Sequence, residues 1–152
     1  MEVKIIDYDP RYRHHFKDLN VEWIAQYFTV EPHDLEQLED PENYILSRGG
    51  RIFFALYGEE IIGTVALIKV SETVFEMVKM AVRPGFRGLG AGEKLGRHLI
   101  EAARQAGGQR LFLESNQKLT PALTLYRKLG FVEIPIGETL YSRADFKAEI
   151  YL

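Results

Sequence analysis

The sequence predicts one mixed α/β domain whose sheet is mostly antiparallel. Three strand-like apolar runs follow one another over residues 51–82, with connections of only two or three residues between them. Connections that short join antiparallel strands, because a parallel crossover needs about a dozen residues. Segments with helical periodicity alternate with shorter apolar runs afterwards. The chain of 152 residues has the length of one domain, and no linker or low-complexity tract interrupts it.

The first 50 residues are expected to form a short strand and two helices. Residues 2–8 are typical of a strand. Residues 11–28 repeat apolar side chains at near-helical spacing. A second, acidic helix is expected to begin near Pro32, since proline is tolerated in a first helical turn. Residues 41–47 are expected to add no more than a turn before a glycine pair.

After the three hairpin strands, helices and strands alternate. A helix with one apolar face is predicted from residue 91 up to a second glycine pair, and a strand buried on both sides at residues 110–115. The next helix should have Thr120 as its N-cap and Gly130 as its left-handed C-terminal cap. Residues 140–150 alternate apolar and polar side chains, which predicts a half-exposed antiparallel strand.

Composition and charge narrow the function classes. The net charge of −3 shows no basic excess for general nucleic-acid binding, and no apolar run approaches the roughly 20 residues that cross a bilayer. The sequence has no cysteine and no secretory leader pattern, so we expect a cytoplasmic protein without disulfides. Residues 18–47 carry eight acidic and no basic side chains, while residues 83–110 carry six basic and two acidic ones. This asymmetry indicates either two solvated faces or sites for ligands of opposite charge.

The glycine-rich stretch MAVRPGFRGLGAGEKLG, residues 80–96, leads from a predicted strand into a helix. Such a stretch favours phosphate binding, because glycines allow backbone N–H groups to approach an anion. It is not a Walker P-loop, since Ala91 and Gly92 stand where Lys and Ser/Thr are required. It is not a dinucleotide fingerprint, because Glu93 replaces the third glycine, although Glu114 lies about where a ribose-binding acid would.

What remains is Arg87-x-x-Gly90-x-Gly92 after a strand, opening a helix. This pattern resembles the Gln/Arg-x-x-Gly-x-Gly/Ala signature of the GNAT superfamily of acyl-CoA-dependent N-acyltransferases. PALTLYRKLGFVE, residues 121–133, resembles a second signature of that family. The resemblance runs from about residue 50 to the end. It implies the GNAT fold, with about seven strands splayed at a coenzyme A slot and about four helices.

The resemblance implies an acetyl-CoA site, with the pyrophosphate at the helix N-terminus and the pantetheine arm paired to the preceding strand. Met80 N–H would bond the acyl carbonyl. Family members commonly have an asparagine three residues before the motif alanine, where this chain has Leu119; either Asn116 makes that contact across a longer loop or the contact is absent. The residues expected to contact the cofactor are Met80, Ala81, Val82, Arg87, Gly88, Leu89, Gly90, Ala91, Gly92, Asn116 and Tyr126.

Two side chains are candidates for proton transfer. Tyr126 occupies the family's general-acid position and has a pKa near 10, suited to protonating a thiolate; the alternative is a core tyrosine. Glu76 interrupts an apolar strand where several family members have a base, and burial would raise its pKa; the alternative is a surface glutamate. Strict alternation places Glu76, Val78 and Met80 on one face of the strand and Lys79 on the other.

The acceptor is expected at the N-terminal helices and the last hairpin. Glu22, Trp23 and Tyr27 are candidates for an acidic, aromatic amine site, although the two aromatic residues also suit the core. Arg143 is a candidate for holding a substrate carboxylate, or a solvated residue at an edge. The four histidines are not spaced as metal ligands, so no metal is expected.

The sequence therefore predicts an acetyl-CoA-dependent N-acetyltransferase that acetylates a primary amine of a small molecule or peptide in a ternary complex. A non-catalytic acyl-CoA-binding module is the alternative, and a nucleotide-binding domain is a weaker one. No nucleic-acid or membrane partner is expected, and a homodimer is compatible with the sequence.

Overall fold

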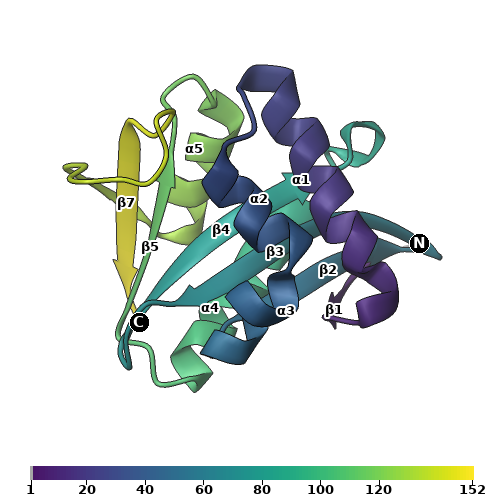
Figure 1. Cartoon of the computed structure of the whole chain (residues 1–152), viewed down its shortest axis with the longest axis horizontal. Helices are drawn as coiled ribbons and strands as arrows, with labels where there is room; N and C mark the ends of the chain where they lie inside the picture. Colours follow the sequence, from purple (N-terminus) through teal and green to yellow (C-terminus); the bar gives the residue numbers. More distant parts are fainter. Residues whose placement is uncertain (1) are drawn as a thin grey trace.

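A seven-stranded sheet in the order β1-β2-β3-β4-β5-β7-β6 forms the centre of the computed structural model, which describes residues 2–152 (Figure 1). All neighbouring strands are antiparallel except β4 and β5, which are parallel. The strands are β1 (Val3–Asp7), β2 (Arg51–Tyr57), β3 (Glu60–Lys69), β4 (Val74–Val82), β5 (Arg110–Ser115), β6 (Val132–Ile134) and β7 (Phe146–Tyr151). The helices are α1 (Arg13–Tyr27), α2 (Pro32–Glu39), α3 (Pro41–Tyr44), α4 (Ala91–Gln105) and α5 (Thr120–Leu129).

The predicted order of elements and the number of strands are confirmed. The structure has five helices rather than about four, because residues 41–44 complete one helical turn, α3. None of the described helices is both long and apolar enough to cross a membrane.

Helices cover both faces of the sheet: α1, α2 and α3 lie in front of it in Figure 1, and α4 and α5 behind it. Each face has its own core, because successive strand residues point to opposite sides. In β2, Phe53 packs with α4, whereas Phe54 packs with Phe16 of α1 and Leu38 of α2. All four side chains are fully or almost fully buried.

The sheet opens between β4 and β5. The two strands pair only from Val74 to Glu76, opposite Arg110 to Phe112. Beyond that point β4 stays with β3 while β5 stays with β7, and the two strands diverge (Figure 1). The second half of β4 therefore has a sheet partner on one side only, and the splay that the family resemblance implied is present.

A bulge in β4 changes which side chains face the opening. Val78 pairs with Ala66 and Ala81 pairs with Thr64, so Lys79 and Met80 both oppose one residue of β3. Lys79 has a φ of 57°, an uncommon left-handed conformation for a residue other than glycine. The extra residue keeps Lys79 on the α1–α2 face with Val78 and turns Met80 to the α4–α5 face. The alternation predicted from the sequence, with Met80 beside Glu76 and Lys79 opposite, is wrong beyond Val78 for this reason.

The last strand is shorter than predicted. β7 begins at Phe146, and the preceding residues form a loop in which Ala144 N–H donates to Tyr141 O (3.2 Å) and Asp145 N–H donates to Ser115 O (3.0 Å). Alternation alone predicts a strand from residue 140, because it cannot show that Tyr141 and Arg143 turn toward α2.

Two further local predictions are corrected. β5 buries Leu111 and Leu113 on one side, but Phe112 and Glu114 on its other side are only partly buried. The α1–α3 layer covers β3 and β4 and leaves that side of β5 open. The N-cap of α5 is Leu119 rather than Thr120, and no side chain caps the helix there.

The C-terminus of α5 ends as the sequence predicts. Gly130 has a φ of 104°, in the left-handed region where a side chain is unfavourable. The following residue, Phe131, donates its N–H to Tyr126 O (3.0 Å), and its ring lies edge-on to Tyr126 at 6.3 Å between centroids. This cap fixes Tyr126 in place.

Replacing Gly50 by alanine is expected to destabilise the fold by about 1–3 kcal/mol. A Cβ at Gly50 would overlap the Leu67 carbonyl oxygen and lie 2.8 Å from the Ile45 carbonyl oxygen, and neither backbone can easily move away. Urea denaturation measures the loss. Gly85→Ala is the matched control, because a Cβ there meets nothing within 4 Å, and its effect should stay within about 0.5 kcal/mol. Equal effects of the two substitutions would contradict the prediction.

Candidate functional site

Two connected cavities occupy the opening between β4 and β5. The first, called here the groove, lies between the end of β4, the residues before α4, and α5, and encloses about 540 Å³. The second, the inner pocket, lies between α1, β4, β5 and the loop before β7, and encloses about 90 Å³. The residues that line both cavities are Trp23, Met80, Leu119 and Tyr126.

The groove has the parts of an anion site at one end. Gly88 and Gly90 have φ values of 87° and 79°, and a Cβ on either would meet no other atom within 4 Å. Gly90 is the N-cap of α4 and no side chain caps the helix, so its first N–H groups have no intrahelical partner. Arg87 is exposed, lines the groove and forms no ion pair with any residue in the range 2–152. The site can therefore take a phosphate at the helix N-terminus.

The other end of the groove runs along β4. Met80, Ala81 and Val82 line it, in the part of β4 that β5 does not pair with. Backbone groups on an unpaired strand edge can bind an extended chain as an added strand. Leu89, also predicted to contact the cofactor, is 43% exposed and lies outside the groove lining.

Glu76 points into the inner pocket. Burial, and after it the nearby Glu114 carboxylate, raise the pKa of its carboxyl to about 7, although Lys79 and Lys147 partly oppose this. A carboxyl group with a pKa near 7 can accept a proton at neutral pH. Glu76 is thus a partly buried pocket residue and not a surface glutamate.

Tyr126 lies where the groove and the inner pocket meet. Burial raises the pKa of its phenol, and the Ser115 hydroxyl partly lowers it. A phenol that stays protonated can donate a proton or a hydrogen bond to a group in either cavity.

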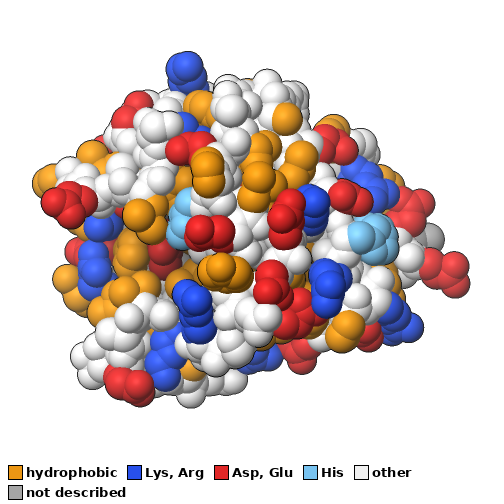
Figure 2. Space-filling view, viewed as in Figure 1, with side chains coloured by type: hydrophobic (Ala, Val, Ile, Leu, Met, Phe, Trp, Pro, Cys, Tyr) orange, Lys and Arg blue, Asp and Glu red, His pale blue; other side chains and the backbone are white. Residues whose placement is uncertain are grey.

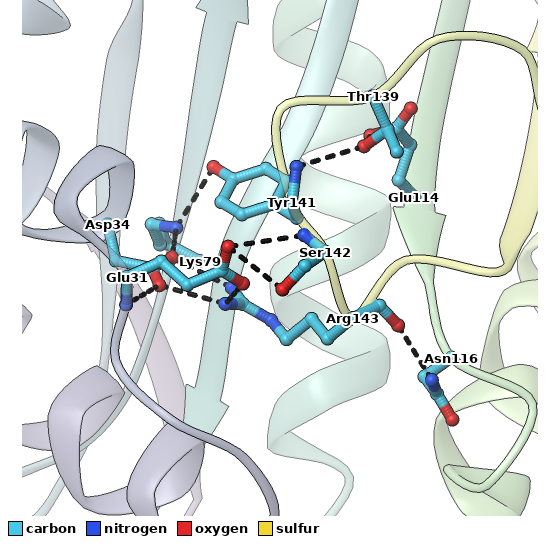
Figure 3. A network of polar contacts seen from close by, with 9 residues as sticks. All are labelled: Glu31, Asp34, Lys79, Glu114, Asn116, Thr139, Tyr141, Ser142 and Arg143. Carbon is cyan, nitrogen blue, oxygen red and sulfur yellow. Dashed lines mark hydrogen bonds and ion pairs between the residues drawn. The ribbon is translucent and has the colours of Figure 1, made fainter.

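A buried ionic network forms one wall of the inner pocket (Figure 3). Asp34, at the start of α2, is 0% exposed and accepts from Lys79 Nζ at 2.5 Å. Its two oxygens also accept from Arg143 Nη1 and Nη2 at 2.8 and 2.7 Å, and Glu31 accepts from the same Nη1 at 2.9 Å. Burial alone would raise the pKa of Asp34, but Arg143 and Lys79 hold it well below its usual range. Lys79 Nζ also donates to Tyr141 Oη at 3.1 Å.

The network fixes the loop before β7. Glu31 accepts from Ser142 N–H and its hydroxyl at 3.1 and 3.2 Å. Asn116 donates to Arg143 O at 2.6 Å (Figure 3). It also accepts from Lys118 N–H at 2.9 Å. The Asn116 amide thus lies in the inner pocket and not in the groove, and its cofactor contact stays a prediction.

The predicted acceptor residues separate in the structure. Trp23 lines both cavities and is half-buried, while Tyr27 lines only the groove and is 46% exposed. Glu22 is exposed on α1 and lines neither cavity. Arg143 lines the inner pocket as predicted, but its charge is paired with Asp34 and Glu31.

The acidic run at residues 18–47 does not form a uniform surface. Acidic and basic side chains are interspersed over the α1–α3 face (Figure 2). Glu39 and Glu42 pair with Lys17 and Arg13 of α1. Most of this run is therefore a solvated face. Within residues 2–152, no group of three His, Asp or Glu side chains is placed so that it could bind a metal ion.

The sequence interpretation missed Asp34, Lys79, Tyr141 and Asn20, which build the inner pocket or its wall. One signal was available for Asp34: it stands three residues after Glu31, and the two residues form a capping box at the start of α2. No local pattern indicates that Asp34 would meet Lys79, 45 residues later.

Comparison with known proteins agrees with this geometry. Residues 16–131 match the acetyltransferase (GNAT) family. An uncharacterized N-acetyltransferase of Escherichia coli is 32% identical over 111 residues, which are 70% of this chain and 64% of that protein. The match thus spans slightly less than two thirds of that relative's length.

Solved structures share the fold across almost the whole chain. A GNAT-family acetyltransferase from Staphylococcus aureus superposes with a TM-score of 0.89 at 23% identity, covering 98% of both chains. A GNAT-family acetyltransferase from Elizabethkingia anophelis, solved with acetyl-CoA bound, superposes with a TM-score of 0.67 at 23% identity, covering 99% of both chains. From its sequence match and its fold, the chain belongs to the GNAT family of acetyltransferases.

Proposed function

We propose that this protein transfers the acetyl group of acetyl-CoA to a primary amine, by direct attack in a ternary complex. One observation carries the proposal: the groove and the inner pocket meet at Met80 and Tyr126, and Glu76 lines the inner pocket. One cavity suits the acyl donor and the other the amine, with a proton acceptor on the amine side.

The groove fits acetyl-CoA. The uncapped N-terminus of α4 and the free charge of Arg87 suit a pyrophosphate, and the unpaired edge of β4 suits the pantetheine arm. Glu93 also lines the groove, but Lys128 and Arg97 neutralise its charge at 2.9 Å each. Acetyl-CoA-bound relatives with this fold support the same assignment.

The chain's own residues would supply orientation and proton transfer. Bound acetyl-CoA would supply the thioester whose acetyl group moves from sulfur to the amine nitrogen. Glu76 Oε would take a proton from the amine, directly or through water, so that the nitrogen lone pair can form the new C–N bond. Met80 N–H would polarise the acyl carbonyl. Tyr126 Oη would give its proton to the sulfur as the C–S bond breaks.

The test is acetyl-CoA-dependent release of free thiol with a panel of primary amines. An acetyltransferase releases thiol in proportion to the amine consumed. Saturable acetyl-CoA binding without thiol release from any amine would instead favour an acyl-CoA-binding module. Tight binding of NAD or ATP without coenzyme A binding would favour a nucleotide-binding domain.

Replacing Tyr126 by phenylalanine is expected to lower kcat about tenfold and to change coenzyme A affinity little. The expected loss is modest because a thiolate is a good leaving group and can depart without full protonation. Steady-state kinetics with saturating amine measures it. Tyr151→Phe is the matched control, since Tyr151 is 72% exposed at the end of β7. Unchanged kcat in Tyr126→Phe would show that Tyr126 is a packing residue.

A further inference from the structure

We propose that the acceptor is a small linear diamine: a primary amine whose chain carries a second cationic group and no carboxylate near the reacting nitrogen. The inference rests on the proposed function and names the substrate class for the same site. It follows from how the charges around the inner pocket are paired.

The cations in the inner pocket are already neutralised. Lys79 and Arg143 are the basic residues among its described lining residues. Lys79 binds Asp34, and Arg143 binds Asp34 through two nitrogens and Glu31 through one. These two positive and two negative groups cancel. A carboxylate beside the reacting amine would therefore find no free cation and would face Glu76.

The carboxylates on the other side of the pocket lack such pairing. Glu76, Glu114 and Tyr141 line the inner pocket and also a second opening, called here the outer opening. The outer opening adds the exposed Glu138. Its one lining lysine among the described residues is Lys147, which lies over the Phe112 ring at 4.8 Å. The carboxylates of Glu114 and Glu138, joined by Glu76 when it is ionised, outnumber the one ammonium and favour a cationic occupant.

His33, which also lines the outer opening, does not offset this charge. Its Nδ1 lies 3.5 Å from Glu36. Thr139 donates to Glu114 at 2.6 Å, which holds that carboxylate at the opening without neutralising it. The lining that the outer opening shares with the inner pocket is thus acidic.

The inner pocket itself suits an alkylamine. It is narrow, and Trp23, Ile24 and Phe28 of the α1 end give it apolar walls that an aliphatic chain can contact. Asn20, 1% exposed, also lines it. Its side-chain nitrogen donates to Phe16 O at 2.9 Å, which leaves the amide oxygen to accept a hydrogen bond from an amine.

Three acceptors with the same four-carbon chain test the inference: 1,4-diaminobutane, butylamine and 4-aminobutanoate, each with saturating acetyl-CoA. We expect kcat/KM to be about fivefold higher for the diamine than for butylamine, the ratio one partly exposed ion pair supplies. We expect kcat/KM for 4-aminobutanoate to be lower than that for butylamine by about tenfold or more. Equal values for the diamine and butylamine, or faster acetylation of the amino acid, would overturn the inference. A higher kcat/KM for Nα-acetyl-lysine amide than for the diamine would also overturn the inference.

A variant that leaves one positive charge of the Lys79–Arg143 pair unbalanced gives an independent readout. Glu31→Gln removes one of the two carboxylates that share Arg143. The kcat/KM ratio of 4-aminobutanoate to butylamine should rise several-fold in Glu31→Gln. It should not change in Glu39→Gln, which removes a surface carboxylate paired with Lys17. An unchanged ratio in a folded Glu31→Gln protein would overturn the argument from charge pairing.

If Glu31→Gln does not fold, the exposed Glu138→Gln replaces it. The diamine-to-butylamine ratio should then fall, and a ratio equal to that of the unsubstituted protein would overturn the inference. Release of no thiol with any amine, despite acetyl-CoA binding, would instead overturn the proposed function and this inference with it. Thiol release in a different order of acceptors would overturn this inference alone.

Discussion

Replacing Glu76 by glutamine should lower kcat by about 10²-fold or more and remove the low-pH limb of the rate profile. General bases typically contribute 10²–10⁴-fold, and an amide cannot accept the amine proton. Burial and the Glu114 charge raise the pKa of Glu76 to about 7, so the unsubstituted protein should gain activity as the pH rises through about 7. The measurement is kcat against pH with saturating amine and acetyl-CoA.

Two carboxylate variants serve as comparisons for Glu76→Gln. Glu114→Gln removes a neighbouring negative charge that raises the pKa of Glu76, so its low-pH limb should move to lower pH. Glu72→Gln changes an exposed residue of the β3–β4 turn and should leave the profile unchanged. A normal rate and profile in Glu76→Gln would exclude Glu76 as the base.

Stability separates a catalytic loss from an unfolding effect. The pKa of Glu76 is raised in the folded state, so burial of this group costs nothing below the unfolded pKa of about 4.3 and disfavours folding as the pH rises through about 7. Glu76→Gln should therefore be more stable than the unsubstituted protein at pH 8, by up to about 3 kcal/mol, and show no gain at pH 4. A less active but more stable variant is the signature of a buried base.

Much of the fold could be predicted because its signals are local. Short connections define the hairpins of β2, β3 and β4, and Gly130 ends α5 where a left-handed cap is needed. The glycine pattern around Gly90 predicts both the start of α4 and an anion site, since one backbone geometry serves both. The sequence also identifies Glu76 as a candidate site residue, because a charged side chain in an apolar strand is unusual.

The wall of the inner pocket could not be predicted in the same way. The bulge at Lys79 depends on how β4 pairs with β3, and no residue in the sequence requires a left-handed conformation there. The alternating pattern predicts that Arg143 lies in a strand, but its ion pair with Asp34 holds its loop against the inner pocket. These contacts join residues separated by 45 and 109 positions, so only the assembled sheet brings them together.

Replacing Asp34 by asparagine should lower the free energy of unfolding by about 3–5 kcal/mol at pH 7. Asp34 is fully buried between Lys79 and Arg143, and removing one partner of a buried ion pair leaves an uncompensated charge. The amide oxygen of asparagine can still accept from Glu31 N–H, so the start of α2 keeps that hydrogen bond, but its NH2 group cannot accept from Lys79 Nζ and Arg143 Nη2 as the second Asp34 oxygen does. Urea denaturation measures the change. Glu39→Gln, which breaks a surface pair with Lys17, is the control and should cost less than about 1 kcal/mol.

The pH dependence and a double substitution show whether Asp34 acts through its charge. The pKa of Asp34 is depressed in the folded state. Its contribution to the free energy of unfolding is therefore complete above the pKa of an unfolded aspartate, about 3.9, and is lost as the pH falls below that value. The stability difference between the protein and Asp34→Asn should therefore be constant from pH 7 to about pH 5 and shrink below pH 4. Adding Lys79→Gln to Asp34→Asn should cost less than the two single losses together, by about 0.5–3 kcal/mol. Additive losses with no pH dependence would mean that Asp34 stabilises the fold by packing, and that its charge does not hold Lys79 and Arg143 in the pocket wall.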